Sequence, residues 1–279
     1  MFICDAQVHI WAGDSPGHAD PNDPAPHRAG PFGAEDLLIE MAIAGVGRAV
    51  LIPPSAQGDS NDVALAAARR YPDRFAVVGR IALDDPASRY AMTGWTRRPG
   101  MLGVRASFSG GARRAWLTDG TAAWLWQVTE RERIPVMMLV PGQVAAVDAI
   151  ASRHPGLPII IDHMGRQTGL RDAAAFADLD DLLALARRPN VAVKMSAVPR
   201  FSSEPYPHRN LHPYVRRIYD AFGPQRMLWG TDLSRLRTPY RQAVTMFTEE
   251  MPFLSPDDLE WIMGRSAYEW LNWPLVVST

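Results

Sequence analysis

The chain has 279 residues, of which 47% are hydrophobic and 21% charged, and its formal net charge is −1. This length can bury a large core, and the composition is ordinary for a soluble enzyme. A nearly neutral chain gives no electrostatic reason to expect nucleic acid or an anionic membrane as a partner. A single cysteine, Cys4, excludes an internal disulfide. With no signal-peptide pattern and no apolar run of about 18 residues, the sequence predicts a cytoplasmic protein.

The first apolar segment, residues 2–11, carries polar side chains at alternate positions. In a β-strand, residues two apart point to the same face, so Gln7 and His9 are expected to project together, with Asp5 in phase behind them. Such groups are costly in a core unless they meet partners. A histidine satisfied by a neighbouring carbonyl is the structural alternative to a functional one. The long loop that follows, residues 12–33, exceeds the usual connection length and is expected to be functional.

Short apolar runs then alternate with segments of helical periodicity along the chain. The expected strands lie within residues 2–11, 48–53, 75–83, 101–106, 134–140, 157–163, 191–196 and 227–232. The expected helices span residues 34–44, 61–71, 118–132, 144–154, 178–187, 213–222, 240–251, 256–263 and 266–271, with a short helical segment opening after residue 84. Continuous apolar strands between amphipathic helices indicate a parallel sheet buried on both faces. Eight units without a composition break predict an α/β fold, a (β/α)8 TIM barrel, as one domain over residues 1–279.

Polar residues end several of these strands. In a barrel the carboxyl ends of the strands converge on one mouth, where the chemistry of such enzymes lies. The candidates are Gln7, His9, Ser55, Arg105, His163, Lys194, Ser196 and Asp232. Each could be structural by itself, but packing gives no reason for two imidazoles, two cations, a carboxylate and an amide to gather there. The set therefore predicts an active site.

The ordered motifs resemble the amidohydrolase superfamily, and within it the amidohydrolase-related lactonases. The matching segments are residues 5–11 (DAQVHIW), 79–84 (GRIALD), 103–105 (GVR), 161–165 (IDHMG), 193–196 (VKMS), 229–232 (WGTD) and 264–273 (GRSAYEWLNW). The resemblance implies a barrel-shaped hydrolase that opens a lactone or related carboxylic ester. It allows a monomer or a homo-oligomer.

One departure from the family pattern concerns metal binding. The family's first strand normally ends in His-x-His, which binds a divalent metal, but here the first of these positions is Gln7. An amide oxygen is a weaker ligand than an imidazole for zinc. His9, His163 and Asp232 would remain as ligands for one zinc or manganese ion, in a weakened site. The alternative, catalysis without a metal, is the one that Gln7 favours.

The candidate residues predict a mechanism. Asp232 is the expected general base, which takes a proton from the attacking water. His163 and His9 are expected to polarise the carbonyl as it becomes an oxyanion, with Lys194 as a further donor or as the ion-pair partner of Asp232. Arg105 suits a substrate carboxylate, because its guanidinium offers a bidentate fork. An ion pair that closes the barrel mouth is the structural alternative for Arg105.

The loops after the fourth and seventh strands, residues 107–120 and 199–213, are expected to set selectivity. Substrate contacts are also predicted for Arg200 and Tyr206 in the second loop, and for Gln7, Trp11 and Ser55. These residues favour a small anionic or aromatic-derived substrate, whereas loop arginines that face water are the structural alternative.

Other functions stay open at this stage. Related barrels decarboxylate aromatic or muconate acids with a bound metal, and Gln7 counts against that chemistry. Hydrolysis of an amide or cyclic imide shares the same attack step. A binding protein that lost its chemistry is disfavoured, because it would have no physical reason to keep a buried carboxylate at Asp232.

Overall fold

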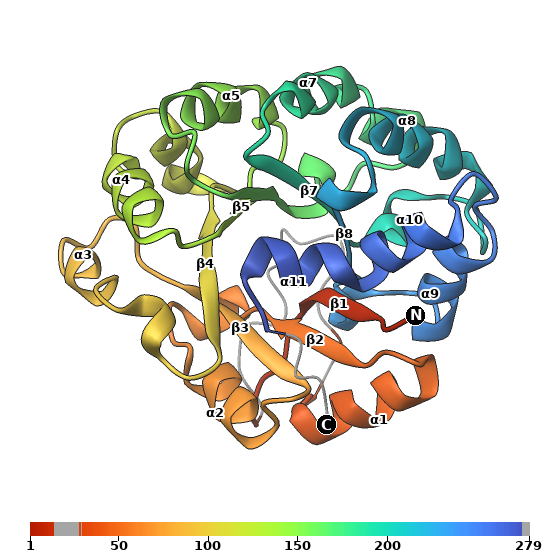
Figure 1. The fold of residues 1–279 in the computed structure, drawn as a ribbon, viewed down its shortest axis with the longest axis horizontal. Coiled ribbons are helices and arrows are strands. Elements are labelled where there is room, and N and C mark those ends of the chain that lie inside the picture. The colour runs from red at the N-terminus through yellow and green to blue at the C-terminus, as the bar shows by residue number, and fades with distance from the viewer. Residues whose placement is uncertain (14–27, 29, 275–279) are drawn as a thin grey trace.

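The computed structural model describes residues 1–13, 28 and 30–274. Its strands form one parallel sheet in the order β1 to β8, each paired with the next along the chain. The strands are β1 Cys4–Val8, β2 Arg48–Leu51, β3 Phe75–Arg80, β4 Met101–Ser107, β5 Val136–Leu139, β6 Ile159–Ile161, β7 Val191–Met195 and β8 Met227–Trp229. The sheet curls into a nearly closed barrel with helices around it (Figure 1), which confirms the predicted (β/α)8 fold.

The surrounding helices follow the strands in alternation. They are α1 Ala34–Ala44, α2 Asp62–Arg70, α3 Ser88–Ala91, α4 Ala123–Glu132, α5 Val144–Arg153, α6 Asp172–Ala175, α7 Leu179–Ala184, α8 His212–Phe222, α9 Tyr240–Thr248, α10 Pro256–Glu260 and α11 Ser266–Leu271. Two differences from the sequence prediction are α6, which was not predicted, and the start of α4, which was expected at residue 118. A 3₁₀ segment, Gly111–Leu117, and a turn containing Gly120 at φ 96° take up the residues before it.

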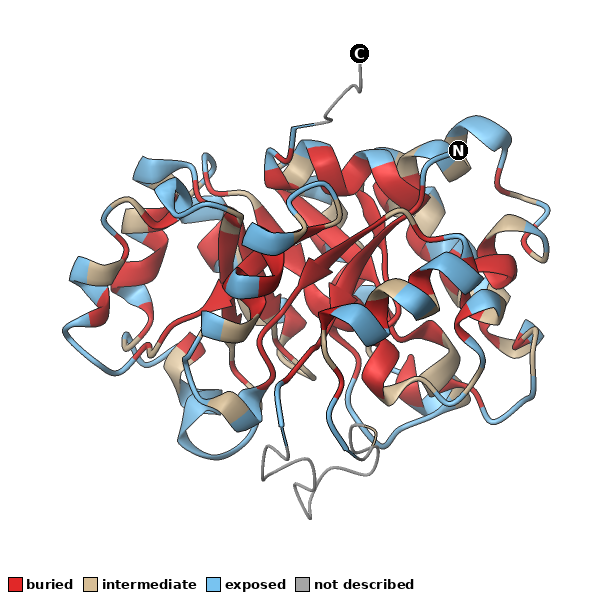
Figure 2. Cartoon of the chain, turned by 90° about the horizontal axis from the view of Figure 1, so that it is seen from below, coloured by how far each residue is buried: buried red, intermediate tan, exposed pale blue. Residues whose placement is uncertain are grey.

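The strands are buried on both faces, as their continuous apolar runs predicted (Figure 2). One apolar cluster fills the space between the sheet and the helices. A smaller cluster lies inside the barrel and includes Cys4, Val50 and Ile160 together with Tyr268 and Leu271 of α11. Since α11 packs on this inner cluster at one end, the carboxyl ends of the strands form the accessible mouth of the barrel.

The seam between β8 and β1 is joined by the Asp5 carboxylate. Asp5 Oδ1 accepts the backbone N–H groups of Gln7 at 3.0 Å and Thr231 at 2.9 Å, and Oδ2 accepts the Tyr240 hydroxyl at 2.8 Å. The Asp232 N–H donates to the Gln7 carbonyl at 2.9 Å across the same seam. The expectation that the Asp5 side chain points to the same face of the strand as Gln7 and His9 was wrong, because the register of β1 against β2 shifts between Asp5 and Val8. Asp5 therefore closes the barrel.

Candidate active site

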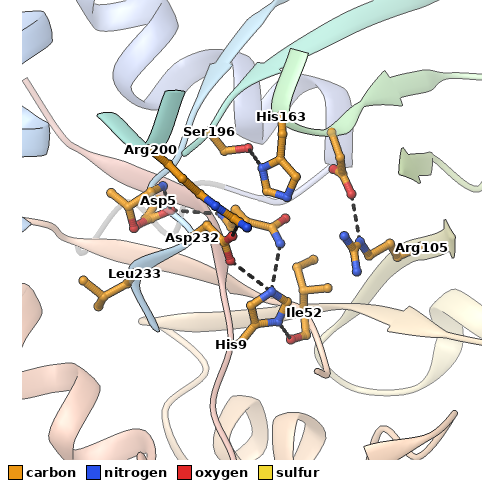
Figure 3. A network of polar contacts seen from close by, with 12 residues as sticks. Asp5, His9, Ile52, Arg105, His163, Ser196, Arg200, Asp232 and Leu233 are labelled. Carbon is orange, nitrogen blue, oxygen red and sulfur yellow. Dashed lines mark hydrogen bonds and ion pairs between the residues drawn. The ribbon is translucent and has the colours of Figure 1, made fainter. Parts of the chain in front are cut away.

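A cavity of about 340 Å³ lies at the carboxyl end of the barrel. Six of the residues predicted from the sequence line it: His9, Ser55, Arg105, His163, Arg200 and Asp232. Figure 3 shows the side chains of His9, His163 and Asp232 turned toward one another, with Arg200 and Arg105 beside them. The strand ends thus converge as the barrel prediction required. Most of the predicted loop at residues 12–33 lies outside the described residues.

Two of these residues adopt left-handed backbone conformations immediately after their strands. His163 has φ 50° and ψ 36°, and Asp232 has φ 57° and ψ 45°. Non-glycine residues pay for this conformation, and such strain gathers at functional sites. The backbone turns sharply there and places both side chains in the cavity wall.

The Asp232 carboxylate is buried and surrounded by cationic or polarised groups. Its Oδ1 is 3.2 Å from His9 Nε2, and its Oδ2 is 3.5 Å from Arg200 Nη1. Burial by itself would raise the pKa of Asp232, but the neighbouring side chains of His9, His163 and Arg235 hold that pKa well below its usual range. Asp232 is therefore an ionised carboxylate at neutral pH, as a general base must be.

His163 contacts the end of β7. Its Nδ1 is 2.8 Å from the Ser196 hydroxyl oxygen. Burial lowers the pKa of His163 to about 4, against the opposing charges of Asp232 and Asp162. The imidazole is therefore neutral at physiological pH, and it can donate from Nε2 when Ser196 donates to Nδ1.

A buried ion-pair cluster lies beneath the cavity, centred on Asp162. Asp162 Oδ1 is 2.6 Å from Lys194 Nζ, and Oδ2 accepts from Arg105 Nε at 2.8 Å. Neither role predicted for Lys194, a donor to the oxyanion or the ion-pair partner of Asp232, fits the structure: Lys194 is fully buried outside the cavity lining, and its partner is Asp162. Burial would raise the pKa of Asp162, but these two cations hold it far below its usual range. Arg105 thus makes a structural ion pair, which was the alternative to its predicted contact with a substrate carboxylate. Arg105 also lines the cavity.

Gln7 and His9 contact each other, as their spacing predicted. Their Nε2 atoms are 3.2 Å apart, and His9 Nδ1 is 2.6 Å from the Ile52 carbonyl oxygen. Gln7 is completely buried, and its Oε1 accepts from Lys194 Nζ at 2.9 Å. Gln7 therefore lies behind His9 and does not line the cavity, so the prediction that it contacts the substrate was wrong.

Trp11 and Tyr206, predicted to contact the substrate, do not line the cavity. The Trp11 indole is buried and donates from Nε1 to the Gly30 carbonyl at 2.7 Å. The Tyr206 hydroxyl is 2.9 Å from Thr245 Oγ1 on α9, so this ring packs toward the outer helices. We correct both assignments, because long aromatic side chains find hydrogen-bond partners that a sequence pattern does not show.

Arg80, Asp162 and Arg235 escaped the sequence-based assignment, whereas Arg113 lies in the loop at residues 107–120 that was expected to set selectivity. Arg80, Arg113 and Arg235 line the cavity, and with Arg105 and Arg200 they make five guanidinium groups around it. Arg80 could have been found as the end of a strand, like the other candidates. Asp162 directly precedes His163 at the end of an apolar run, which was the available signal for a buried partner. Nothing in the sequence distinguished Arg113 from the adjacent Arg114.

An ionised carboxylate, two imidazoles and a ring of guanidinium groups in a barrel mouth define a hydrolase-type site. The chain belongs to the amidohydrolase family, whose model matches residues 4–273. This confirms the predicted family membership and the prediction of an amidohydrolase-family hydrolase.

Individual relatives extend over most of the chain. It is 30% identical to an L-fucono-1,5-lactonase of Burkholderia ambifaria, over 95% of this chain and 94% of that protein. It is 27% identical to a 4-sulfomuconolactone hydrolase of Hydrogenophaga intermedia, over 71% of this chain and 64% of that protein. A zinc-bound amidohydrolase structure from Burkholderia multivorans superposes with a TM-score of 0.81 at 22% identity, covering 98% of this chain and all of that one.

The fit of a metal to this site can be judged from its donors. Within residues 1–13, 28 and 30–274, no group of three or more His, Cys, Asp or Glu side chains is placed to hold a metal ion. The amide oxygen at position 7 is taken by the Lys194 ammonium, a cation that would repel a second one. The described donors therefore do not fit a metal, and we derive no step through one. Whether the protein binds one zinc or manganese ion, or no metal, stays at the level of the sequence-based prediction.

In the described part of the chain, no helix has both the length and the apolarity needed to cross a bilayer. The cytoplasmic location, the homo-oligomer and the assignment of residues 1–279 to one domain stay predictions.

Proposed function

We propose that the protein hydrolyses a lactone or related carboxylic ester that carries an anionic group. The observation that carries this proposal is one cavity that combines the ionised Asp232 carboxylate, two imidazoles and five guanidinium groups. The names of the two relatives, a fucono-lactonase and a sulfomuconolactone hydrolase, support lactone hydrolysis. Guanidinium groups bind carboxylates and other oxyanions through charge-assisted hydrogen bonds.

The reaction follows from the placement of the groups. Asp232 takes a proton from water as the water oxygen bonds to the lactone carbonyl carbon. The carbonyl oxygen becomes an oxyanion, which His163 Nε2–H and a guanidinium can stabilise. The ring C–O bond then breaks, and the proton on Asp232 passes to the departing oxygen. The product is an open-chain hydroxy acid, and Asp232 is again ionised.

The anionic selectivity can be tested at Arg113. The Arg113→Gln variant is expected to lower kcat/KM for a carboxylate-bearing lactone by about 10-fold or more, because a charge-assisted hydrogen bond contributes about 1.5–3 kcal/mol. A neutral lactone of the same ring size should change by less than about 2-fold, since it lacks the group that the guanidinium would bind.

The adjacent Arg114 gives a matched control. It donates to the carbonyl oxygens of Pro141 and Gly142 at 3.0 and 3.3 Å and does not line the cavity. Arg114→Gln should leave the ratio of the two kcat/KM values unchanged. A wild-type preference for neutral lactones would contradict the anionic substrate class.

The pH dependence tests which group is the base. Because the pKa of Asp232 lies well below its usual range, the carboxylate stays ionised and remains available as a base as the pH falls toward 5. We expect kcat/KM to be constant within about 2-fold between pH 8 and pH 5. A base with the ordinary histidine pKa would instead lose about 10-fold per pH unit below about 6.5. Such an acid limb would contradict the assignment of Asp232.

Metal removal tests the remaining alternative. Activity toward lactones is expected to survive exhaustive chelation, with metal content measured on the same sample, because Lys194 occupies the amide of Gln7. Loss of activity on chelation, with recovery on adding zinc or manganese, would contradict this expectation. It would favour His9, His163 and Asp232 as metal ligands and reopen the metal-dependent decarboxylase alternative. Assays with an amide or cyclic imide in place of the lactone address the other alternative.

A further inference from the structure

The hydrogen bonds behind the cavity all run in one direction. The chain of contacts is Lys194 to Gln7, Gln7 to His9, and His9 to the Ile52 carbonyl, at 2.9, 3.2 and 2.6 Å. Its two ends have fixed polarity: an ammonium only donates, and a carbonyl oxygen only accepts. The direction of every bond between them is therefore determined by chemistry.

The donor and the acceptor of each hydrogen bond in this chain can be assigned from the neighbouring groups. Since Lys194 can only donate, the Gln7 atom that faces it is the oxygen, and the Gln7 NH₂ faces His9 Nε2. Since the Ile52 oxygen can only accept, the hydrogen on the His9 ring is on Nδ1. Both neighbours thus require a lone pair, with no hydrogen, at His9 Nε2.

The first donor in this chain is itself held in place. Lys194 is fully buried and lies 2.6 Å from Asp162 Oδ1. A buried ammonium stays charged when a carboxylate pairs with it, so it keeps donating to Gln7. The completely buried Gln7 amide is consequently fixed in one orientation.

We infer that Gln7 and Lys194 are positioning residues that hold His9 with a hydrogen on Nδ1 and an acceptor at Nε2. This inference rests on the proposed function for its catalytic meaning. His9 Nε2 and Asp232 Oδ1 are 3.2 Å apart, and Asp232 Oδ1 has no hydrogen-bond partner among the described residues. Because the His9 Nε2 lone pair already accepts from Gln7, Asp232 Oδ1 is the acceptor left for the incoming water, and the oxyanion is left to His163. His9 thus has a different role from the oxyanion donor that the sequence predicted.

Nitrogen NMR of protein labelled with ¹⁵N-histidine tests the inference directly. In the wild-type protein at neutral pH, the His9 signals, assigned by their loss in His9→Asn, should show a protonated Nδ1 and an unprotonated Nε2. A protonated Nε2 in the wild type would overturn the inference. The NMR measurement needs no substrate, so its result is independent of whether the protein hydrolyses a lactone.

The Gln7→Glu variant reverses one bond of the chain with a side chain of the same shape. A carboxylate still accepts from Lys194 but cannot donate to His9, so His9 Nε2 should gain a proton. We expect both ring nitrogens to be protonated, kcat to fall at least 10-fold, and KM to change by less than about 3-fold. An unchanged His9 spectrum in folded Gln7→Glu would contradict the inference.

Gln143, a half-buried glutamine, provides a control for the change from glutamine to glutamate. Its Nε2 donates to the Phe108 carbonyl at 2.9 Å, and it does not line the cavity. The Gln143→Glu variant should keep the wild-type His9 spectrum. If Gln7→Glu does not fold, the wild-type spectrum decides the assignment by itself.

Discussion

The Asp232→Asn variant is expected to reduce kcat by about 10³-fold, because asparagine cannot accept the proton of the attacking water, and positioned general bases contribute about 10²–10⁴-fold. Asparagine has nearly the same shape and tolerates the left-handed conformation that this position requires, with φ 57°. KM should change little, since the substrate is held mainly by the guanidinium groups. Steady-state kinetics with an anionic lactone measure kcat and KM, and a melting curve on the same sample shows whether the variant is folded.

Asp172 offers a matched control for this substitution. It also has a positive φ, 53°, but lies outside the cavity and accepts from the Ser203 N–H at 2.8 Å. Asp172→Asn should change kcat by less than about 2-fold. If Asp232→Asn retained more than a tenth of the wild-type kcat while remaining folded, another group would be the base.

The second large effect is on stability. The Asp162→Asn variant removes the only carboxylate that pairs with Lys194 and Arg105 within the described residues. Both cations are buried, and breaking a buried ion pair from one side costs about 3–5 kcal/mol, because an uncompensated charge is left behind. We expect a loss of this size in the free energy of unfolding, measured by denaturant titration.

A double variant separates the charge effect from a simple packing defect. Adding Lys194→Met to Asp162→Asn removes one of the two uncompensated cations and keeps an unbranched side chain in its place. The double variant should regain at least half of the lost free energy. A double variant less stable than Asp162→Asn would show that shape, and not charge, accounts for the loss.

The sequence determined that residues at the ends of the strands meet at the barrel mouth. Apolar runs between amphipathic segments required a parallel sheet, and a closed parallel sheet brings all strand ends together. His9, Arg105, His163 and Asp232 were therefore assigned to the cavity without any knowledge of distances, and all of them line it. The alternation of side chains between the two faces of a strand is a local property, so it can be predicted from the sequence directly.

Only the tertiary structure decided which of these groups are partners. Lys194 could have paired with Asp162 or Asp232, and only the packing of β6 against β7 places its ammonium 2.6 Å from Asp162. The shift in register within β1 turned Asp5 to the seam and left Gln7 with His9. Arg113 entered the cavity and Arg114 did not, although they are adjacent. Hydrogen-bond and ion-pair partners depend on contacts between residues far apart in the sequence, and these contacts are fixed only when the barrel closes.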